Sequence, residues 1–555
     1  MLARAMPAKA RSAGRALRLP ALAAGLLLAA AAAAAGVAGV AGWLWVGAPR
    51  VWRAGEVPVA FWAWRAEAPS ESEVEAARRE TGARTLFMRA GQLDYEGGRV
   101  ERVRAVTGKF PRTVELHLVY NATPALLSAF GRVGEDDVAS AVAAAFARDA
   151  RRGADDGATI AGLQLDLDVP TRLLPRYGRV LASVRGRLPA GTRLSVTGLP
   201  TWMGSAELAG ALAAADFWAP QFYGSEIPRR LTEAVPVSSP RRVARDAARA
   251  SALGKPFYAG LAAYGYAGLY SERGELRALR GDLAPEDAAR HASLELVERR
   301  PFAARADDGR GGGGSEGAGG AKAEGAAAGG WRYVFRAREA AVVSGTSVAE
   351  GESLVFYSTG GEGLRAAARA VRKNAGAALV GVCVFRLPSG EDRTTLGLAQ
   401  VAAALADRAA EVSTIVRAAR PSSAGAESAK QLELTAINDG AVGAHVGDGA
   451  LTLTLRVRPG SLRGVASLEG FDAVETLCES GAAPARPCGP RRAGLLRLGA
   501  RSWPAGASAR VGLSFEGEPP ASLEMHVRVR AEDGRAFARA EVVRASPRTV
   551  RLRGR

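Results

Sequence analysis

Hydrophobic and polar residues alternate along residues 160–171, IAGLQLDLDVPT, with the two-residue period of a β-strand. One face of this strand carries leucines, and the other face carries Gln164, Asp166 and Asp168. Buried strands usually place apolar side chains inside, so two carboxylates and an amide on one face need a reason. Two interpretations are open: an active or ligand site at the end of this strand, and a buried polar cluster whose members bond to one another.

Strand-like and helix-like segments alternate on both sides of this stretch. Apolar and β-branched runs predict strands at residues 57–65, 84–94, 112–121, 160–171, 192–202, 216–224, 255–265 and 377–388. Helical spacing predicts helices at residues 70–82, 135–152, 173–188, 207–215, 240–254 and 394–406. This alternation predicts an α/β fold, a (β/α)8 TIM barrel over residues 55–408, with its chemistry at the C-terminal ends of the strands.

A long excursion, about residues 266–376, separates the seventh and eighth predicted strands. Its low-complexity tract, residues 305–330, is rich in glycine and is expected to be disordered. Beyond the tract, residues 331–337 and 352–360 are typical of a strand pair, and residues 362–374 of a helix. An insertion of this kind could form a wall over the mouth of the barrel.

The pattern changes after about residue 410. The segments QLELTAINDG, ALTLTLRVRPG, GLLRLGA, ARVGLSFEG and LEMHVRVRAEDG alternate apolar and polar residues, with Asp-Gly turns and no helical period. This pattern predicts a C-terminal antiparallel β-sandwich of immunoglobulin-like type over residues 425–555. Nothing in its sequence indicates a ligand.

The N-terminal 50 residues are typical of an export segment. Residues 1–18 carry five basic side chains and no acidic one, and no further charge follows before Arg50. This uncharged interval exceeds the roughly 20 apolar residues that cross a bilayer, which favours an uncleaved transmembrane anchor helix over a cleaved signal peptide. The positive-inside rule then predicts a single-pass protein of the cell inner membrane, with its bulk in the periplasm or extracellular space, or a secreted protein if the segment is cleaved.

The charge and cysteine content narrow the class of partner. The chain has 74 Lys and Arg against 56 Asp and Glu, a net charge of +18, but the arginines are scattered without interleaved aromatics. We therefore expect no nucleic-acid partner, and attraction to an anionic envelope surface is favoured instead. Cys478 and Cys488 bracket a short loop and are a candidate disulfide in an oxidising compartment, whereas Cys383 lies within an apolar strand. No metal site or cofactor is expected.

The strand ends predict a polar and aromatic barrel mouth. Acids, amides and arginines suit the hydroxyls of a sugar, and aromatic rings suit its faces. The candidate catalytic residues are Asp168, Asp166 and Tyr223, and the candidate substrate-binding residues are Gln164, Gln221, Arg65, Arg89, Glu115, Asn121, Trp202, Tyr258 and Phe385. His117 lies in the middle of a predicted strand, where a structural histidine is favoured over a catalytic one.

These residues resemble a known family. The stretch GLQLDLDV, residues 162–169, resembles the fourth-strand signature of the family 18 glycoside hydrolases, which are chitinase-like barrels. The resemblance implies that Gln164 stands at the first strand aspartate, Asp166 at the second, and Asp168 at the glutamate that acts as general acid. It also implies that Tyr223 of APQFYG is the sixth-strand tyrosine and that Phe385 replaces a tryptophan floor.

A second resemblance covers more of the chain. The segments AFWAWR, LQLDLDVPT, LSVTGLPTW and PQFYG are similar, in this order, to a bacterial family catalogued as domain of unknown function 3142, over about residues 55–410. This resemblance implies a barrel of glycosidase-like shape and no particular reaction.

Two function classes follow from the predicted mouth. The first is an exported glycoside hydrolase-like enzyme that acts on an envelope or extracellular polysaccharide, with Asp168 as general acid and Asp166 as its electrostatic partner. The second is a non-catalytic carbohydrate-binding barrel that organises envelope glycans, since Gln164 lacks a charge and Asp168 reaches one methylene less far than glutamate. A metal-dependent hydrolase is a third hypothesis, weakened because the four histidines are scattered.

Overall fold

The computed structural model describes residues 52–224, 226–302, 330–390, 392–421, 428–480, 483–532, 535–545 and 550–553. The predicted anchor over residues 1–50 lies outside these residues, as does nearly all of the predicted disordered tract. In the described part of the chain, no helix combines the length and the apolar character that a membrane crossing requires.

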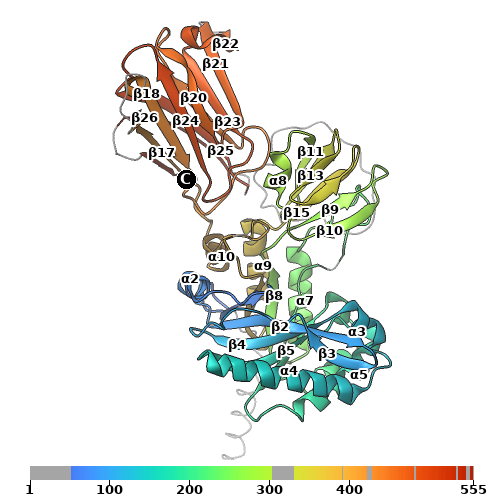
Figure 1. Ribbon diagram of the computed structural model, residues 1–555. Coiled ribbons are helices and arrows are strands. Elements are labelled where there is room, and N and C mark those ends of the chain that lie inside the picture. Colours follow the sequence, from blue (N-terminus) through green and yellow to red (C-terminus); the bar gives the residue numbers. More distant parts are fainter. Residues whose placement is uncertain are drawn as a thin grey trace, which may run out of the picture. The chain divides into compact units, whose positions relative to one another are not determined.

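Eight parallel strands close into the predicted barrel (Figure 1). They are β1 (Val59–Ala63), β2 (Thr85–Glu96), β4 (Glu115–Ala122), β5 (Thr159–Asp166), β6 (Arg193–Gly198), β7 (Phe217–Pro220), β8 (Phe257–Ala262) and β16 (Leu379–Phe385). The first strand pairs with both β2 and β16, which closes the sheet without a free edge. The short strand β3 (Arg99–Val103) extends the end of β2 as an antiparallel hairpin. The eight strands are those that the sequence predicts.

Helices between the strands cover the outside of the barrel. They are α2 (Glu71–Thr81), α3 (Pro124–Ala129), α4 (Glu135–Asp155), α5 (Leu174–Arg185), α6 (Leu208–Ala211), α7 (Pro240–Ala252), α9 (Gly361–Asn374) and α10 (Leu398–Leu405). Their bounds follow local signals, as α2 shows. Its N-cap Ser70 and Glu73 bond reciprocally to each other's backbone N–H, and Gly82 ends the helix with a φ of 73°. The sequence therefore sets this helix within one residue at each end.

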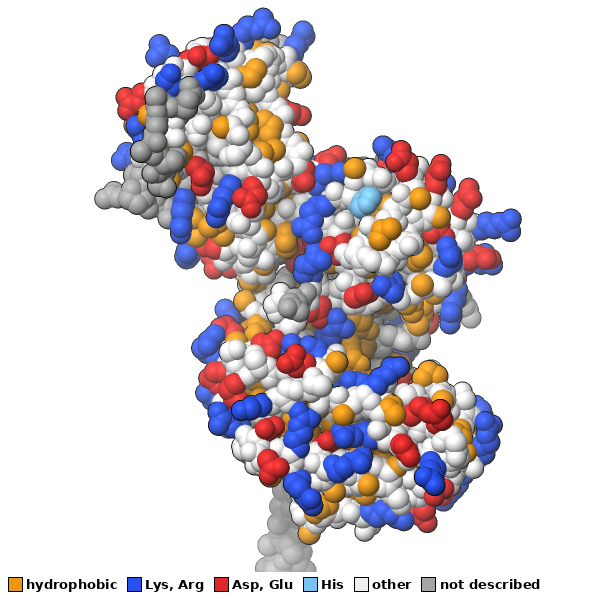
Figure 2. All heavy atoms as spheres, in the orientation of Figure 1, with side chains coloured by type: hydrophobic (Ala, Val, Ile, Leu, Met, Phe, Trp, Pro, Cys, Tyr) orange, Lys and Arg blue, Asp and Glu red, His pale blue; other side chains and the backbone are white. Residues whose placement is uncertain are grey.

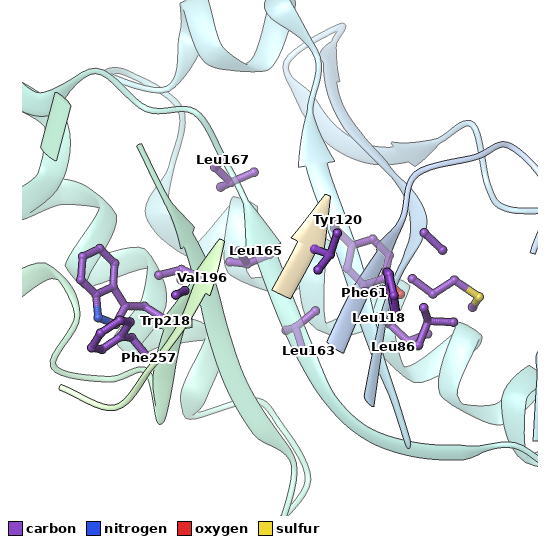
Figure 3. Packing of buried hydrophobic residues seen from close by; sticks show 14 of the residues in the cluster. Phe61, Leu86, Leu118, Tyr120, Leu163, Leu165, Leu167, Val196, Trp218 and Phe257 are labelled. Atoms are coloured by element: carbon purple, nitrogen blue, oxygen red, sulfur yellow. The ribbon is translucent and has the colours of Figure 1, made fainter. Parts of the chain in front are cut away.

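Two apolar layers lie on the two sides of the barrel strands. Leu163 and Leu165 of β5, with Leu167 just beyond it, point outward into the layer beneath the helices, as Figure 3 shows. A second cluster, which includes Trp62 and Phe87, lines the inside of the barrel and continues into the excursion at Val334 and Val355. The leucine face and the polar face of β5 therefore look in opposite directions, as the alternation predicts.

The excursion between β8 and β16 forms a separate antiparallel sheet. Its strands are β9 (Tyr266–Tyr270), β10 (Leu276–Arg280), β11 (Leu294–Pro301), β12 (Trp331–Ala337) and β15 (Ser353–Ser358), joined by the hairpin β13 (Ala341–Val343) and β14 (Thr346–Val348) and the helix α8 (Pro285–Ala289). The predicted strand pair is confirmed, because β12 and β15 are antiparallel neighbours. The predicted helix is α9, which packs on α7, α10 and β8 and so belongs to the helical layer of the barrel.

The C-terminal part consists of two antiparallel sheets that share one apolar core. One sheet contains β17 (Ser413–Ala419), β18 (Gln431–Ile437), β20 (Leu462–Glu469), β24 (Ser508–Phe515) and β27 (Val550–Arg553), and the other contains β19 (Leu451–Arg456), β21 (Ala473–Ser480), β22 (Ala483–Pro487), β23 (Leu495–Ala500), β25 (Ser522–Arg530) and β26 (Ala536–Arg544). All five segments predicted as strands are strands. The immunoglobulin-like type and the domain boundaries stay predictions.

Charges of both signs are mixed on the surface. Figure 2 shows Lys and Arg side chains interspersed with Asp and Glu over one face of the molecule. The excess of basic residues therefore forms no continuous basic track on that face.

Candidate functional site

Asp166 is the last residue of β5 and faces the inside of the barrel mouth. The Thr197 hydroxyl, on the neighbouring strand β6, donates a hydrogen bond to its carboxyl group. Burial and the nearby charge of Asp168 raise the pKa of Asp166 to about 7, and the hydrogen bond from Thr197 opposes them only in part. Asp166 therefore keeps its proton at a pH where an exposed aspartate is ionised.

Asp168 follows β5 by two residues and is exposed at the lip of the mouth. Its backbone is fixed from behind, because the Trp202 indole nitrogen donates to the Val169 carbonyl at 3.0 Å. Desolvation by the surrounding protein raises the pKa of the Asp168 carboxyl as well. The two carboxyls titrate as a coupled pair, in which one proton is held more tightly than either carboxyl would hold it alone.

Gln164 lies one step deeper in the barrel and is fully buried. Its amide oxygen accepts a hydrogen bond of 2.7 Å from the Trp62 indole, and its amide nitrogen donates to the Ser195 hydroxyl at 3.3 Å. The Ser195 hydroxyl in turn donates to the Leu163 carbonyl at 3.4 Å. The polar face of β5 is thus divided: Gln164 is a satisfied buried group, while Asp166 and Asp168 are held with raised pKa values at the opening.

An aromatic group lies near the two carboxyls. Tyr223 stacks on Phe385, with ring centroids 5.8 Å apart, and Tyr264 meets Phe385 edge-on at 5.2 Å. The ring centroids of Trp64 and Phe385 are 6.2 Å apart. Burial, together with the charges of Asp166 and Asp168 among others, raises the pKa of Tyr223 well above its ordinary value. Tyr223 therefore stays a neutral hydroxyl, close enough to the acids for their charges to act on it.

Two amides complete the rim of the mouth. Asn121 pairs in register with Asp166 on one side and with Gln92 of β2 on the other. The side-chain oxygens of Gln92 and Asn121 are buried and accept no hydrogen bond from the described residues. Buried polar atoms without partners are rare, so these two oxygens are available to a ligand or to water.

Sequence reasoning missed Gln92 because of a β-bulge. Simple alternation from Phe87 and Arg89 would place Gly91 inside and Gln92 outside, but the register with β4 shifts between Arg89 and Gly91. Gly91, an isolated glycine within the strand pattern, is the residue that could have signalled this shift. Tyr264, by contrast, continues the inward alternation of β8 beyond its end and could have been found.

Two predicted contacts lie at the opposite end of the barrel. Glu115 starts β4 and forms an ion pair of 2.6 Å with Arg193 at the start of β6. Tyr258 is near the start of β8 and packs between Phe87 and Phe217. The structure does not bring Glu115 or Tyr258 to the mouth, because both residues stand at the amino ends of their strands.

Trp202 serves the scaffold, because it is fully buried in the outer layer against Tyr177. Arg65 pairs through one guanidinium nitrogen with Glu73 of α2 at 2.8 Å. Its Nε and other terminal nitrogen are buried and have no hydrogen-bond partner among the described residues, so Arg65 stays a candidate ligand contact.

Arg89 and Gln221 lie on the inner side of the barrel strands. Arg89 is half-buried on β2, and burial together with the charge of Arg104 lowers its pKa. Gln221 follows β7, where its backbone N–H donates to the Gly198 carbonyl at 2.8 Å. Both remain candidates for ligand contacts, with Asn121 and Phe385.

His117 is buried inside the lower barrel beside Phe87 and Phe217, with ring centroids 4.9 Å and 5.4 Å away. Neither ring nitrogen has a hydrogen-bond partner among the described residues, and burial lowers the pKa of His117 to about 3. A neutral, enclosed imidazole at this depth fits the structural role that the sequence favours.

One family model matches the chain. Residues 129–286 match the domain of unknown function DUF3142. This segment contains β5, β6, β7 and β8, and with them Asp166, Asp168 and Tyr223. The predicted resemblance to DUF3142 is therefore confirmed over residues 129–286, which include LQLDLDVPT, LSVTGLPTW and PQFYG but not AFWAWR. No curated protein sequence matches the chain.

Solved structures similar to this chain include chitinase-like proteins. The spore cortex-lytic enzyme SleL of Bacillus cereus is 13% identical, over 64% of this chain and 74% of that protein, with a TM-score of 0.39. A chitinase of Chromobacterium violaceum is 16% identical, over 63% of this chain and 100% of that protein, with a TM-score of 0.39. The chitinase ChiW of a Paenibacillus strain is 10% identical, over 87% of this chain and 42% of that protein, with a TM-score of 0.42.

Outside the barrel, Cys478 and Cys488 form a disulfide with their Cα atoms 5.8 Å apart. Among the residues that the structure describes, no three His, Cys, Asp or Glu side chains gather in a way that could hold a metal ion.

Proposed function

We propose that this protein is an exported, membrane-anchored glycoside hydrolase-like enzyme that acts on an envelope or extracellular polysaccharide at the barrel mouth. One observation carries the proposal: β5 places a coupled carboxyl pair at the mouth, and Asp168 opens into a surface groove of about 460 Å³. The DUF3142 match over residues 129–286 includes this strand.

The carboxyl pair suits the cleavage of a glycosidic bond. The proton that the pair keeps near neutral pH rests on Asp166 in the free chain and passes to Asp168, which donates it to the glycosidic oxygen as the bond to the anomeric carbon breaks. Water then adds to the anomeric carbon and returns a proton to Asp168, which completes the hydrolysis. Asp166, once ionised, stabilises the positive charge that develops at the anomeric carbon. The raised pKa of each carboxyl keeps a proton in the pair near neutral pH, which this reaction needs.

The remaining groups of the mouth suit a sugar. The stacked rings of Tyr223 and Phe385 offer an apolar surface to a pyranose face, and the Tyr223 hydroxyl can bond to a substrate hydroxyl or carbonyl. The unpartnered oxygens of Gln92 and Asn121 can accept hydrogen bonds from sugar hydroxyls.

The proposed location in the membrane and periplasm is supported by the N-terminal sequence and by one disulfide. The uncharged interval before Arg50 supports an N-terminal anchor in the cytoplasmic membrane. The disulfide between Cys478 and Cys488 supports an oxidising compartment such as the periplasm.

A hydrolysis assay tests the enzymatic proposal. The full chain is incubated with a panel of neutral and acidic polysaccharides, and new reducing ends are measured for the wild type, Asp168→Asn and Asp155→Asn. Asp155 is an exposed carboxylate at the end of α4 and serves as the matched control. We expect Asp168→Asn to lower kcat by roughly 10²–10⁴-fold with Tm unchanged, as for loss of a general acid, and Asp155→Asn to leave kcat intact. Unchanged turnover in Asp168→Asn would remove Asp168 from the mechanism.

A second function is favoured by a separate observation. Gln164 is a neutral amide whose bonds to Trp62 and Ser195 are complete, so the strand carries one charge fewer beneath Asp166 than the family 18 signature implies. This feature suits a carbohydrate-binding barrel without catalysis, which would organise envelope glycans. Glycan binding without release of reducing ends by the wild type would favour this function over hydrolysis.

A further inference from the structure

The groove beside Asp168 has an excess of positive charge. Its walls come from the segment after α3, which carries Arg132, and from the 3₁₀ turn η1 (Thr171–Leu173), which carries Arg172. Asp168 is the one carboxyl group among its lining residues. The groove therefore sets two guanidinium groups against one aspartate.

Arg132 and Arg172 both lack an ion-pair partner in the described part of the chain. The nearby Arg176 and Arg179, by contrast, both pair with Glu135, at 3.2 Å and 2.9 Å. The carboxylate of Glu135 thus pairs with two arginines of α5. No carboxylate among the described residues pairs with Arg132 or Arg172.

The backbone carbonyls after α3 accept hydrogen bonds from Arg176 and not from Arg132. The carbonyl groups that follow α3 would suit a cation, because a helix C-terminus is electronegative. Arg176 takes this role, since it donates to the Phe130 carbonyl at 2.7 Å and also to the Val133 carbonyl. Arg132, although it directly follows the same helix end, is not needed to satisfy these groups.

Asp168 does not neutralise the charges of Arg132 and Arg172. It forms no ion pair with Arg132 or Arg172 among the described contacts, and the pKa of its carboxyl is raised by desolvation rather than lowered by an arginine. A guanidinium fork matches the oxygens of carboxylate, sulfate and phosphate groups, which makes an anion the complementary ligand.

The rest of the lining suits a sugar that carries such an anion. Leu127 and Leu173 supply apolar surface for a ring, and Ser128 supplies a hydroxyl. The groove volume of about 460 Å³ is large enough for more than a single inorganic ion.

We infer that the groove binds the acidic group of an anionic glycan, a carboxylate, sulfate or phosphate carried on the sugar, between Arg132 and Arg172 beside Asp168. This inference rests on the proposed glycan function of the mouth and names its substrate class. The net charge of +18 adds long-range attraction toward such a polymer, which salt weakens.

Binding of matched oligosaccharides tests the inference. Titration calorimetry on the full chain uses oligogalacturonate as the carboxylate probe, chondroitin sulfate oligosaccharides as the sulfate probe, a phosphorylated oligosaccharide as the phosphate probe, and chito-oligosaccharides of equal length as the neutral probe. The variants are Arg132→Gln, Arg172→Gln and their combination. Arg151→Gln is the control, because Arg151 is exposed on α4, has no ion pair among the described residues, and lies toward the amino end of β5.

We expect at least one acidic probe to bind more tightly than the neutral probe at low ionic strength. Each single substitution should weaken that binding about tenfold, and the double substitution should remove the preference for acid, as expected for lost charge-assisted hydrogen bonds. Arg151→Gln should leave the affinity unchanged, and circular dichroism should show that all variants are folded.

Three outcomes would overturn the inference. Neutral probes that bind as tightly as acidic ones would exclude the acidic class while leaving a glycan site in place. Acidic binding that survives the double substitution would place the anion outside this groove. Failure of every probe to bind would count against the glycan function itself as well as against the inference.

Discussion

Asp166 holds its proton because burial and Asp168 both disfavour its charge, and this has a measurable consequence for stability. Its pKa rises from an ordinary 3.8 to about 7 in the folded chain. The folded state therefore binds this proton more tightly than the unfolded state between these values, so folding is weakened as the pH rises from about 4 to 7.

We predict that Asp166→Asn removes this penalty and keeps an acceptor for the Thr197 hydroxyl. The free energy of unfolding of Asp166→Asn should match the wild type near pH 4 and exceed it by on the order of 4 kcal/mol above pH 7. Urea unfolding across this pH range provides the measurement. Asp136→Asn is the control of opposite sign, because hydrogen bonding from Ser183 and the charge of Arg187 lower the pKa of this exposed carboxyl.

His117 should make the chain acid-sensitive. Its folded pKa of about 3 lies below the ordinary histidine value of 6.5, so the unfolded state binds the proton more readily in between. Stability from the neutral imidazole is complete above about pH 6.5 and is lost as the pH falls toward 3. We expect His117→Leu to flatten this part of the stability profile, and His526→Leu, at an exposed position of β25, to leave it unchanged. An identical acid slope in His117→Leu would show that another group titrates.

At the residue scale, the sequence predicted the carboxyl pair and the strand that carries it. Asp166 and Asp168 follow from a two-residue period and a strand end, both of which are local properties. The position of a side chain along the barrel axis, by contrast, cannot be predicted from the local sequence pattern. Glu115 and Asn121 share one face of β4, but their pairing with Arg193 and Asp166, respectively, is set by the register between strands.

At the element scale, β5 depends on a position without a side chain. A Cβ atom at Gly162 would lie 2.4 Å from the Arg193 carbonyl oxygen and 2.6 Å from Nδ1 of His117. Strand β5 can therefore approach β6 only because residue 162 is glycine.

We predict that Gly162→Ala destabilises the chain by at least about 2 kcal/mol, as for overpacking in a core. Removal of the imidazole in the Gly162→Ala, His117→Ala double variant should not restore stability, because the clash with the backbone of Arg193 remains. Gly204→Ala, which has open space around the new Cβ, is the control. Thermal unfolding of the variants gives the comparison, and a Gly162→Ala variant as stable as Gly204→Ala would contradict the packing described for β5.

Most elements of the barrel were predictable, and the exceptions have physical causes. Capping signals such as Ser70 and Gly82 define helices locally. The bulge near Ala90 has only a weak signal, Gly91, because a glycine within a strand does not say which residues then face inward. The predicted helix at residues 362–374 was found, but its place in the barrel layer is decided by packing on α7 and β8.

At the scale of the whole molecule, eight strands interleaved with helices predicted the closed barrel, because right-handed β–α–β connections leave few alternatives. The sandwich-like sheets were predicted from their turns, although β17, β20, β21, β22, β26 and β27 were not assigned beforehand. The anchor and the membrane location rest on the sequence alone, the export rests also on the disulfide, and all three stay predictions.

The central claim is that the barrel mouth, at Asp166 and Asp168, is the glycan site of this protein. The most direct test is a crystal structure of the full chain carrying Asp168→Asn, grown with the oligosaccharide that binds most tightly in the panel. The account predicts a sugar ring against Tyr223 and Phe385, with a glycosidic oxygen within hydrogen-bond distance of residue 168. A sugar bound on the C-terminal sheets, with the mouth empty, would contradict it.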